Sequence, residues 1–184
     1  VDYDGVLSIN PFDLYLNIDL DNYKISKLFN LNSILIEFIQ SELLFNENIS
    51  VNIFINASSN KKDDIFNNAK INFNIINGKI NFNNTKFINN KIGLLELKNS
   101  NLLLEENKLI IRTDVLIDIE DSNSLFSFLN TNKKSRKDIQ NILLNLDYDF
   151  LSNQIKFNNI KVDNKEVGDQ FLTIIDGFND NELN

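Results

Sequence analysis

The sequence lacks the side chains that carry most protein chemistry. Its 184 residues include no histidine and no cysteine. Without imidazole there is no common general base and no catalytic triad, and without thiolates there is neither a disulfide nor a zinc–thiolate site. The five glycines are scattered and form no G-x-G-x-x-G or P-loop pattern. We therefore expect a protein that is not an enzyme, with no catalytic residue, no cofactor and no metal site.

Three short patterns could still support chemistry, but each has a plainer structural interpretation. Ser58 and Ser59 each begin an S-x-x-K pattern, yet the S-D-N and K-T-G motifs that accompany it in catalysis are missing. A pair of carboxylates among the acidic residues could do the work of a glycosidase. The alternation, however, places these acids on outward, polar strand positions, as with Asp114 and Asp118 or Asp147 and Asp149. The run 118–124 is rich in oxygen ligands but lacks the glycine and spacing of an EF-hand loop. We interpret all three as solvated loop or strand surface.

A cluster of basic residues interrupts an otherwise acidic chain. The formal net charge is −8, with a pI near 4.6, so nucleic acid is not expected as a partner. Lys133, Lys134, Arg136 and Lys137 follow one another closely in the sequence. They form either a solvated loop or a contact for anionic lipid headgroups at a membrane surface.

Alternation of apolar and polar residues dominates the chain and predicts a β-rich fold. Asn77-Gly78 predicts a tight hairpin turn, and a change of phase near Asn158-Asn159 predicts a β-bulge. A wide sheet with one apolar face must fold into a sandwich, close into a barrel or curl into a groove that something else covers. The predicted strands, nearly all antiparallel, lie at 12–20, 49–55, 69–75, 80–82, around 87, at 95–97, 102–104, 109–119, 142–150, 155–157 and 160–162.

Three segments depart from this alternation. Residues 23–45 carry apolar residues at helical spacing, 122–129 is expected to form a short helix, and 164–178 an amphipathic terminal helix. No linker separates these elements, so residues 1–184 are expected to form a single domain. The chain has no methionine, no signal peptide and no apolar run long enough to span a bilayer. We expect it to be a fragment of a longer protein whose membrane anchor lies elsewhere.

Four stretches carry a resemblance to a known family: the hairpin INGKINFNNTKF, the strand NKLIIRTDVLIDIED, the short helix SLFSFLNTNKKSRK and the hairpin ILLNLDYDFLSNQIKFNNIKVD. Together, from Asn77 to Asp163, they resemble the C-terminal region of AsmA-like proteins, the group that includes TamB and YhdP. The resemblance extends more weakly to SELLFNENISVNIFIN and is closest to alphaproteobacterial members with A/T-rich genomes. Asparagine, the commonest residue here, is interpreted as a genome bias imposed on solvent positions.

The resemblance implies a long antiparallel curled sheet that forms an open apolar groove, with amphipathic helices at or near the ends. It implies a place in the periplasm, as part of an inner-membrane-anchored protein that assists phospholipid transport between the inner and outer membranes and outer-membrane biogenesis. Expected partners are phospholipid acyl chains, the membrane surface and outer-membrane assembly proteins. The segment 23–45 has no counterpart in the family pattern.

The apolar side chains of the central strands are the predicted groove lining. The mechanism needs no bond chemistry, since acyl chains transfer from water to an apolar floor while headgroups stay hydrated. The alternative that the residues leave open is a structural or partner-binding β-domain with a sealed core. The predicted lining comprises Ile71, Phe73, Ile75, Ile80, Phe82, Leu109, Ile111, Val115, Ile117, Leu144, Leu146, Tyr148, Ile155 and Phe157.

Overall fold

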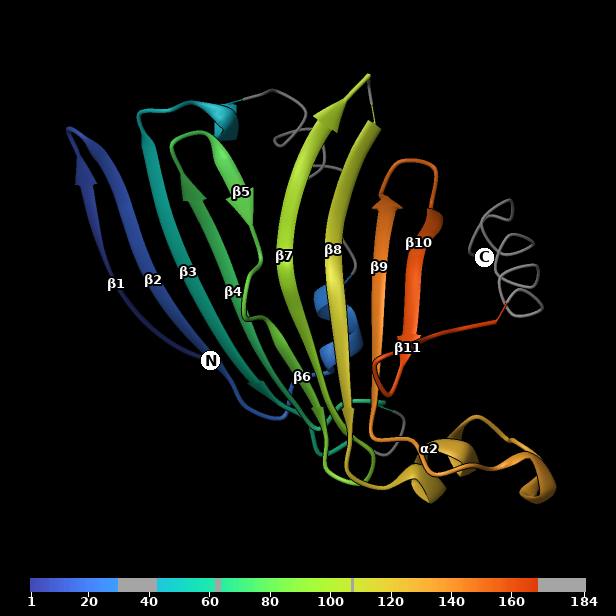
Figure 1. Cartoon of the computed structure of the whole chain (residues 1–184). Helices are drawn as coiled ribbons and strands as arrows, with labels where there is room; N and C mark the ends of the chain where they lie inside the picture. Colours follow the sequence, from blue (N-terminus) through green and yellow to red (C-terminus); the bar gives the residue numbers. More distant parts are fainter. Residues whose placement is uncertain (30–42, 62–63, 107, 169–184) are drawn as a thin grey trace.

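The computed structural model describes residues 1–29, 43–61, 64–106 and 108–168, and these form one sheet of 11 strands. The order is β1-β2-β3-β4-β5-β7-β8-β9-β10-β11, with β6 pairing with both β4 and β7 (Figure 1). The predicted β-dominated fold with a long curled sheet is confirmed. The strands are β1 Asp2–Ile9, β2 Phe12–Leu20, β3 Ile49–Ser58, β4 Asn68–Ile76, β5 Lys79–Asn81, β6 Lys86–Asn89, β7 Gly93–Glu105, β8 Lys108–Ile119, β9 Asn141–Asp149, β10 Gln154–Val162 and β11 Lys165–Glu166.

Strands β2 and β3 run parallel, and the other paired strands run antiparallel. Parallel neighbours need a long crossover, because the chain must return to the end of the sheet from which it started. The described parts of this crossover are two short 3-10 helices, η1 at Ile25–Phe29 and η2 at Leu43–Phe45. The sheet is therefore mixed, and its single parallel pair accounts for the segment that departs from strand alternation.

The three predicted helices have different outcomes. The prediction for 122–129 is confirmed by helix α2, Ser122–Phe128, whose N-cap is Asp121. Of the predicted helix 23–45, the described parts are η1 and η2, and residues 30–42 lie outside the described residues. The prediction for 164–178 is wrong at its start, because Lys165 and Glu166 form β11. Its remainder from residue 169 lies outside the described residues.

A tight turn explains the error at the start of that terminal segment. Asp163 and Asn164 both take left-handed conformations, with φ of 50° and 62°, and Val162 then pairs with Lys165. Two consecutive residues with positive φ make the hairpin turn that matches the twist of antiparallel strands. The hairpin turn therefore determines the structure of residues 162–166, even though the residues after it have helical spacing.

Register keeps the apolar side chains of neighbouring strands on the same face. Val51 on β3 lies opposite Ile75 on β4, Ile75 lies opposite Ile80 on β5, and Ile80 lies opposite Leu102 on β7. Because side chains alternate along a strand, this register brings every second residue of each strand to the same surface. The result is one apolar face that continues from strand to strand across the sheet.

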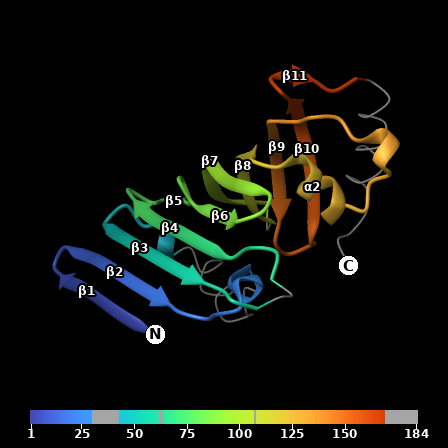
Figure 2. The ribbon, with the colours of Figure 1, turned by 90° about the horizontal axis from the view of Figure 1, so that it is seen from below.

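The sheet curls as it crosses from β1 to β11. Figure 2 shows β9 and β10 at a steep angle to β1, β2 and β3. The register shifts between Lys98 and Asn101 in β7 and between Phe157 and Asn159 in β10. Bulges of this kind bend a strand and increase its twist, so they contribute to the curl. The predicted bulge near Asn158 is confirmed.

Asparagine supplies many of the backbone conformations that other residues avoid. Its short polar side chain tolerates the left-handed region and bonds locally to the backbone. These side chains therefore have a structural use in addition to any genome bias. The asparagines with positive φ are Asn22, Asn77, Asn84, Asn99, Asn130, Asn153 and Asn164.

We predict that Gly78→Ala destabilises the protein strongly, whereas Gly168→Ala does not. Gly78 has a φ of +68° in the predicted hairpin turn, and a Cβ atom there would collide with the Phe45 carbonyl oxygen of η2. The left-handed strain and the collision should together cost about 2–4 kcal/mol of unfolding free energy. A Cβ on Gly168 meets nothing within 4 Å, so it is the matched control for urea denaturation. Equal stabilities for the two variants would contradict the contact between η2 and the hairpin.

Candidate functional site: the apolar face

The structure brings the predicted lining residues together on one face of the sheet. For most of these residues, the strand register determines the face on which the side chain lies. Ile111 lies opposite Leu102 on one side and Tyr148 on the other, and Tyr148 lies opposite Ile155. Phe82, outside the paired stretches, joins them through its ring, whose centroid lies 5.3 Å from that of Phe73. Of this set, the buried residues are Ile75, Ile80, Leu109, Val115 and Leu146. The half-buried residues are Ile71, Phe73, Phe82, Ile111, Ile117, Leu144, Tyr148, Ile155 and Phe157.

The crossover covers the middle of this face at two places. Near one end of the strands, Ile25 of η1 is fully buried in a cluster with Ala57, Ala69 and Phe87. Near the other end, Leu44 and Phe45 of η2 pack against a second cluster of buried residues on β3, β4, β5, β7 and β8. Both views place η1, coloured blue, close to the face of the sheet (Figures 1 and 2). The central strands are thus partly sealed.

The apolar face is most open at β1, a strand that the sequence analysis missed. Tyr3, Leu7 and Ile9 are 78%, 58% and 81% exposed, and register places them on the same face as Ile18, Leu14 and Phe12 of β2. Tyr3, Leu7 and Ile9 occupy alternate positions in the sequence, but two neighbours make the pattern hard to recognise. Gly5 takes the position between Tyr3 and Leu7, and Val6 adds an apolar residue on the opposite face. The cis bond before Pro11, in the β1–β2 turn, lies next to this strand.

Asp64 fastens η1 to the end of the sheet. One carboxylate oxygen accepts hydrogen bonds from the Ser59 hydroxyl at 2.5 Å and the Ile25 amide at 3.1 Å, and the other accepts from the Ser26 amide at 3.5 Å. Burial alone would raise the pKa of Asp64, but the hydrogen bonds from Ser59, Ile25 and Ser26 together hold it below its ordinary value. The ionised carboxylate is therefore the form that holds the crossover in place.

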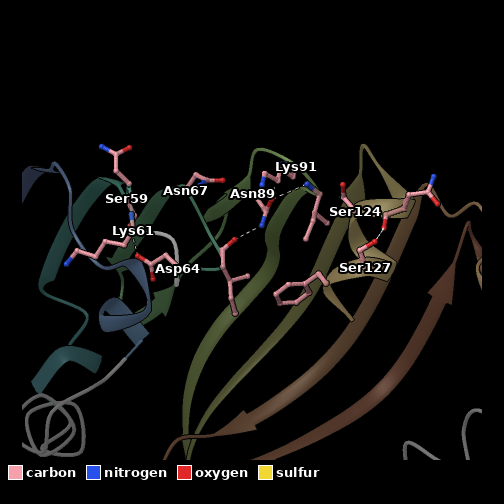
Figure 3. A pocket seen from close by; sticks show the side chains of 13 residues that line it. Ser59, Lys61, Asp64, Asn67, Asn89, Lys91, Ser124 and Ser127 are labelled. Atoms are coloured by element: carbon pink, nitrogen blue, oxygen red, sulfur yellow. Dashed lines mark hydrogen bonds between the residues drawn. The ribbon is translucent and has the colours of Figure 1, made fainter. Parts of the chain in front are cut away.

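A polar cavity of about 900 Å³ adjoins this anchor, between the loop after β3, the turn before β7 and helix α2. Figure 3 shows Ser59 and Asp64 on one side of it, Asn89 and Lys91 in the middle, and Ser124 and Ser127 on the other side. Ser59, from one S-x-x-K pattern, is buried and donates to Asp64, whose lowered pKa makes it a weak base. These contacts favour a structural use of the pattern.

The other acidic patterns also have local partners. The prediction of a solvated position is wrong for Asp149, which is buried at the end of β9, where its carboxylate accepts hydrogen bonds from the Ser152 hydroxyl at 2.7 Å and the Leu151 amide at 3.0 Å. On the polar face, Asp147 accepts hydrogen bonds from the Arg112 guanidinium at 3.1 Å, and Asp114 accepts from Asn99 and Asn145 at 2.7 and 2.6 Å. In the run 118–124, Asp121 caps α2. The side chain and backbone of Ser124, with the Asn123 amide, lower the pKa of Asp121. Within the described part of the chain, no group of three Asp or Glu residues is arranged to hold a metal ion.

The basic cluster lies in the loop between α2 and β9, beyond the ends of the strands (Figure 1). Hydrogen bonds hold the Arg136 side chain against its own loop and the adjoining helix. Its guanidinium donates to the Thr131 carbonyl at 3.1 Å and to the Ser127 hydroxyl at 3.2 Å. Lys133, Lys134 and Lys137 are exposed, and no carboxylate among the described residues pairs with them. The cluster thus presents three exposed ammonium groups in a loop beyond the ends of β8 and β9.

Comparison with known proteins gives no match: no family model, no curated protein and no solved structure is similar to this chain at a significant level. The resemblance to AsmA-like proteins is therefore carried by the sequence stretches alone and stays a prediction. Of the helices that the structure describes, none has the length and apolar character needed to cross a bilayer.

We predict that Asp64→Ala lowers the free energy of unfolding at pH 7 by about 1 kcal/mol, because the hydrogen bonds that anchor η1 are lost. A carboxylate with a depressed folded-state pKa stabilises the protein above its ordinary pKa, 3.8, and loses this effect as pH falls through the folded value. The difference between the variant and the unmodified protein should therefore shrink when urea denaturation is repeated near pH 3.

The matched control is Asp118→Ala. It removes an exposed carboxylate of β8 that accepts no hydrogen bond within the described part of the chain. Its stability should match that of the unmodified protein at both pH values. An Asp64 variant that behaves in the same way would show that η1 is held by apolar packing alone.

Proposed function

We propose that this chain is a non-catalytic lipid-binding protein whose apolar sheet face holds phospholipid acyl chains. The observation that carries the proposal is the continuity of the apolar face, together with its exposure at β1, where Tyr3, Leu7 and Ile9 face solvent. Monomeric soluble proteins rarely expose large contiguous apolar patches, and such patches mark surfaces that bind another apolar partner. Acyl chains fit this surface, since it is long and is formed mainly by aliphatic and aromatic side chains.

Binding at this face requires no bond chemistry. Each Å² of apolar surface removed from water contributes roughly 25 cal/mol, so an acyl chain lying along several strands gains affinity from area alone. The headgroup remains hydrated. The exposed ammonium groups of Lys133, Lys134 and Lys137 lie in the loop before β9, across the sheet from β1, so they suit the anionic headgroup of a lipid bound beside β8 and β9. Such binding discriminates poorly between acyl chains, which favours a carrier of bulk phospholipid.

The cellular role that we propose follows from the resemblance to AsmA-like proteins. In this role the chain is part of an inner-membrane-anchored protein, lies in the periplasm and assists phospholipid transport between the two membranes and outer-membrane biogenesis. The groove-like curl of the sheet supports the proposal, because it lets one continuous apolar face run the width of the domain.

A second candidate function is a structural or partner-binding β-domain with a sealed core. The crossover favours it, because Ile25, Leu44 and Phe45 already cover the central strands. The two candidates differ in what occupies β1 and β2. A lipid carrier keeps this part of the face open for acyl chains, whereas a docking module covers it with the side chains of a protein.

We predict that the protein, purified gently from a bacterial host, carries phospholipid that mass spectrometry detects after extraction. Leu7→Asp should reduce the lipid bound per chain by roughly fivefold or more, because a carboxylate on the apolar face must lose its hydration when an acyl chain covers it. The matched control is Val6→Asp, one residue away in the same exposed strand but on the opposite face. Lipid-free protein, or equal losses in the two variants, would favour the sealed domain.

A further inference from the structure

Helix α2 and the loop after it carry a charge opposite to that of the rest of the chain. Residues 122–137, the basic tip, contain three lysines, one arginine and no acidic residue, which gives a formal charge of +4. The whole chain carries −8, so the remaining residues together carry −12. Figure 1 shows α2 and this loop beyond the ends of β8 and β9, where they protrude from the sheet. A positive segment that protrudes from an acidic body is placed to meet an anionic surface.

Hydrogen bonds give the end of α2 a defined shape. The backbone amides of Asn130 and Thr131 donate to carbonyl oxygens of the last helical turn, at 3.2 and 2.8 Å. Asn130 takes the left-handed conformation, with a φ of 52°, so the two bonds form a Schellman motif that ends the helix and turns the chain. Just before this turn, Phe128 and Leu129 are 50% and 57% exposed. The turn therefore fixes two large apolar side chains in contact with water.

The loop that carries the lysines folds back on the end of α2. The Arg136 guanidinium holds it there, since it donates to the Ser127 hydroxyl of α2 and to the Thr131 carbonyl. Between these bonds the chain forms a short 3-10 helix, η3 at Lys133–Ser135, which Asn132 caps by accepting a hydrogen bond of 3.1 Å. The exposed lysines of this loop are therefore held near the apolar side chains at the end of α2.

We infer that the basic tip docks this protein on the surface of an anionic lipid bilayer. Phe128 and Leu129 enter the interfacial region, where aromatic and aliphatic side chains leave water, and the lysines contact the headgroups. A bilayer presents an apolar layer and a layer of negative charge at the same surface, which matches this pairing of apolar and basic side chains. The inference goes beyond the acyl-chain site, because it rests on the residues of the tip and stands whether or not acyl chains lie on the sheet.

The acidic body does not prevent this contact. At physiological ionic strength, interactions between exposed charges more than about 8 Å apart are largely screened. The protruding tip can therefore reach the headgroups while most of the acidic strands stay farther from them (Figure 1).

Sedimentation of the full chain with phospholipid vesicles tests this contact. The protein should bind vesicles of phosphatidylglycerol, which are anionic, much more tightly than vesicles of phosphatidylcholine, which are zwitterionic. The triple variant Lys133→Gln/Lys134→Gln/Lys137→Gln should bind the anionic vesicles roughly a hundredfold more weakly, because each lysine near such a surface contributes about fivefold to affinity. The matched control, Lys79→Gln/Lys108→Gln/Lys156→Gln, changes the net charge equally at exposed positions of three strands and should keep its binding.

Leu129→Trp adds an independent readout, because it places the chain's single indole at the tip. Its emission should shift to the blue with the anionic vesicles and stay unchanged with the zwitterionic ones. Leu7→Asp should leave the preference for anionic vesicles unchanged, so that failure of the docking and failure of the acyl-chain site are distinguished. Circular dichroism confirms that each variant keeps its strands. Equal losses in the two triple variants, or an indole that stays in water, would overturn the inference, and so would the absence of any preference for anionic vesicles, which would favour an acidic protein as the partner of the tip.

Discussion

The structure depends on one constraint, the register that keeps most apolar side chains of the sheet on the same face. Side chains alternate along a strand, so a shift of one residue in any pairing would turn that strand's apolar set toward the polar surface. The pairs Val51–Ile75, Ile75–Ile80 and Ile80–Leu102 show the register holding through the centre, and Ile111–Tyr148 and Tyr148–Ile155 carry it to the far edge. Where the ladder is interrupted, in β7 and β10, bulges restore the phase and bend the sheet. The bulges that keep the apolar face continuous therefore also contribute to the curl of the sheet.

A face of this extent needs a cover, and the parallel pair β2–β3 provides part of it. Because the chain must return across the sheet between these strands, the crossover brings Ile25 to one end of the face and Phe45 to the other. The two ends are held in different ways. Asp64 accepts hydrogen bonds from the amides at the start of η1, whereas η2 packs through Leu44 and Phe45 and can approach the hairpin because Gly78 has no side chain. The described parts of this cover, η1 and η2, do not reach β1, where Tyr3, Leu7 and Ile9 are exposed.

Strand alternation is a local property, so most of the fold could be predicted from sequence. Strands β2 to β10, the Asn77-Gly78 turn, the bulge near Asn158 and helix α2 were predicted from residues close together in the chain. The parallel pair was not, because nothing local in β2 or β3 distinguishes a hairpin from a crossover. Strand β1 was missed because Gly5 and Val6 obscure its alternation. The predicted start of a terminal helix at residue 164 is wrong because two left-handed residues, Asp163 and Asn164, make a hairpin turn there. The face of each lining residue could be predicted. The burial of Ile75, Ile80 and Leu109 could not, because it depends in part on η2, which packs on them from a distant part of the sequence.

The central claim is that acyl chains lie against the apolar face at β1, and the position of a single fluorophore tests it most directly. The chain contains no tryptophan, so Leu7→Trp and Val6→Trp each introduce one indole, on the apolar and the polar face of the same exposed strand. Phospholipid vesicles with bromine atoms on the acyl chains quench indole fluorescence at contact. The account predicts strong quenching of the indole at position 7 and little at position 6. Equal quenching at both positions, or none at either, would contradict it.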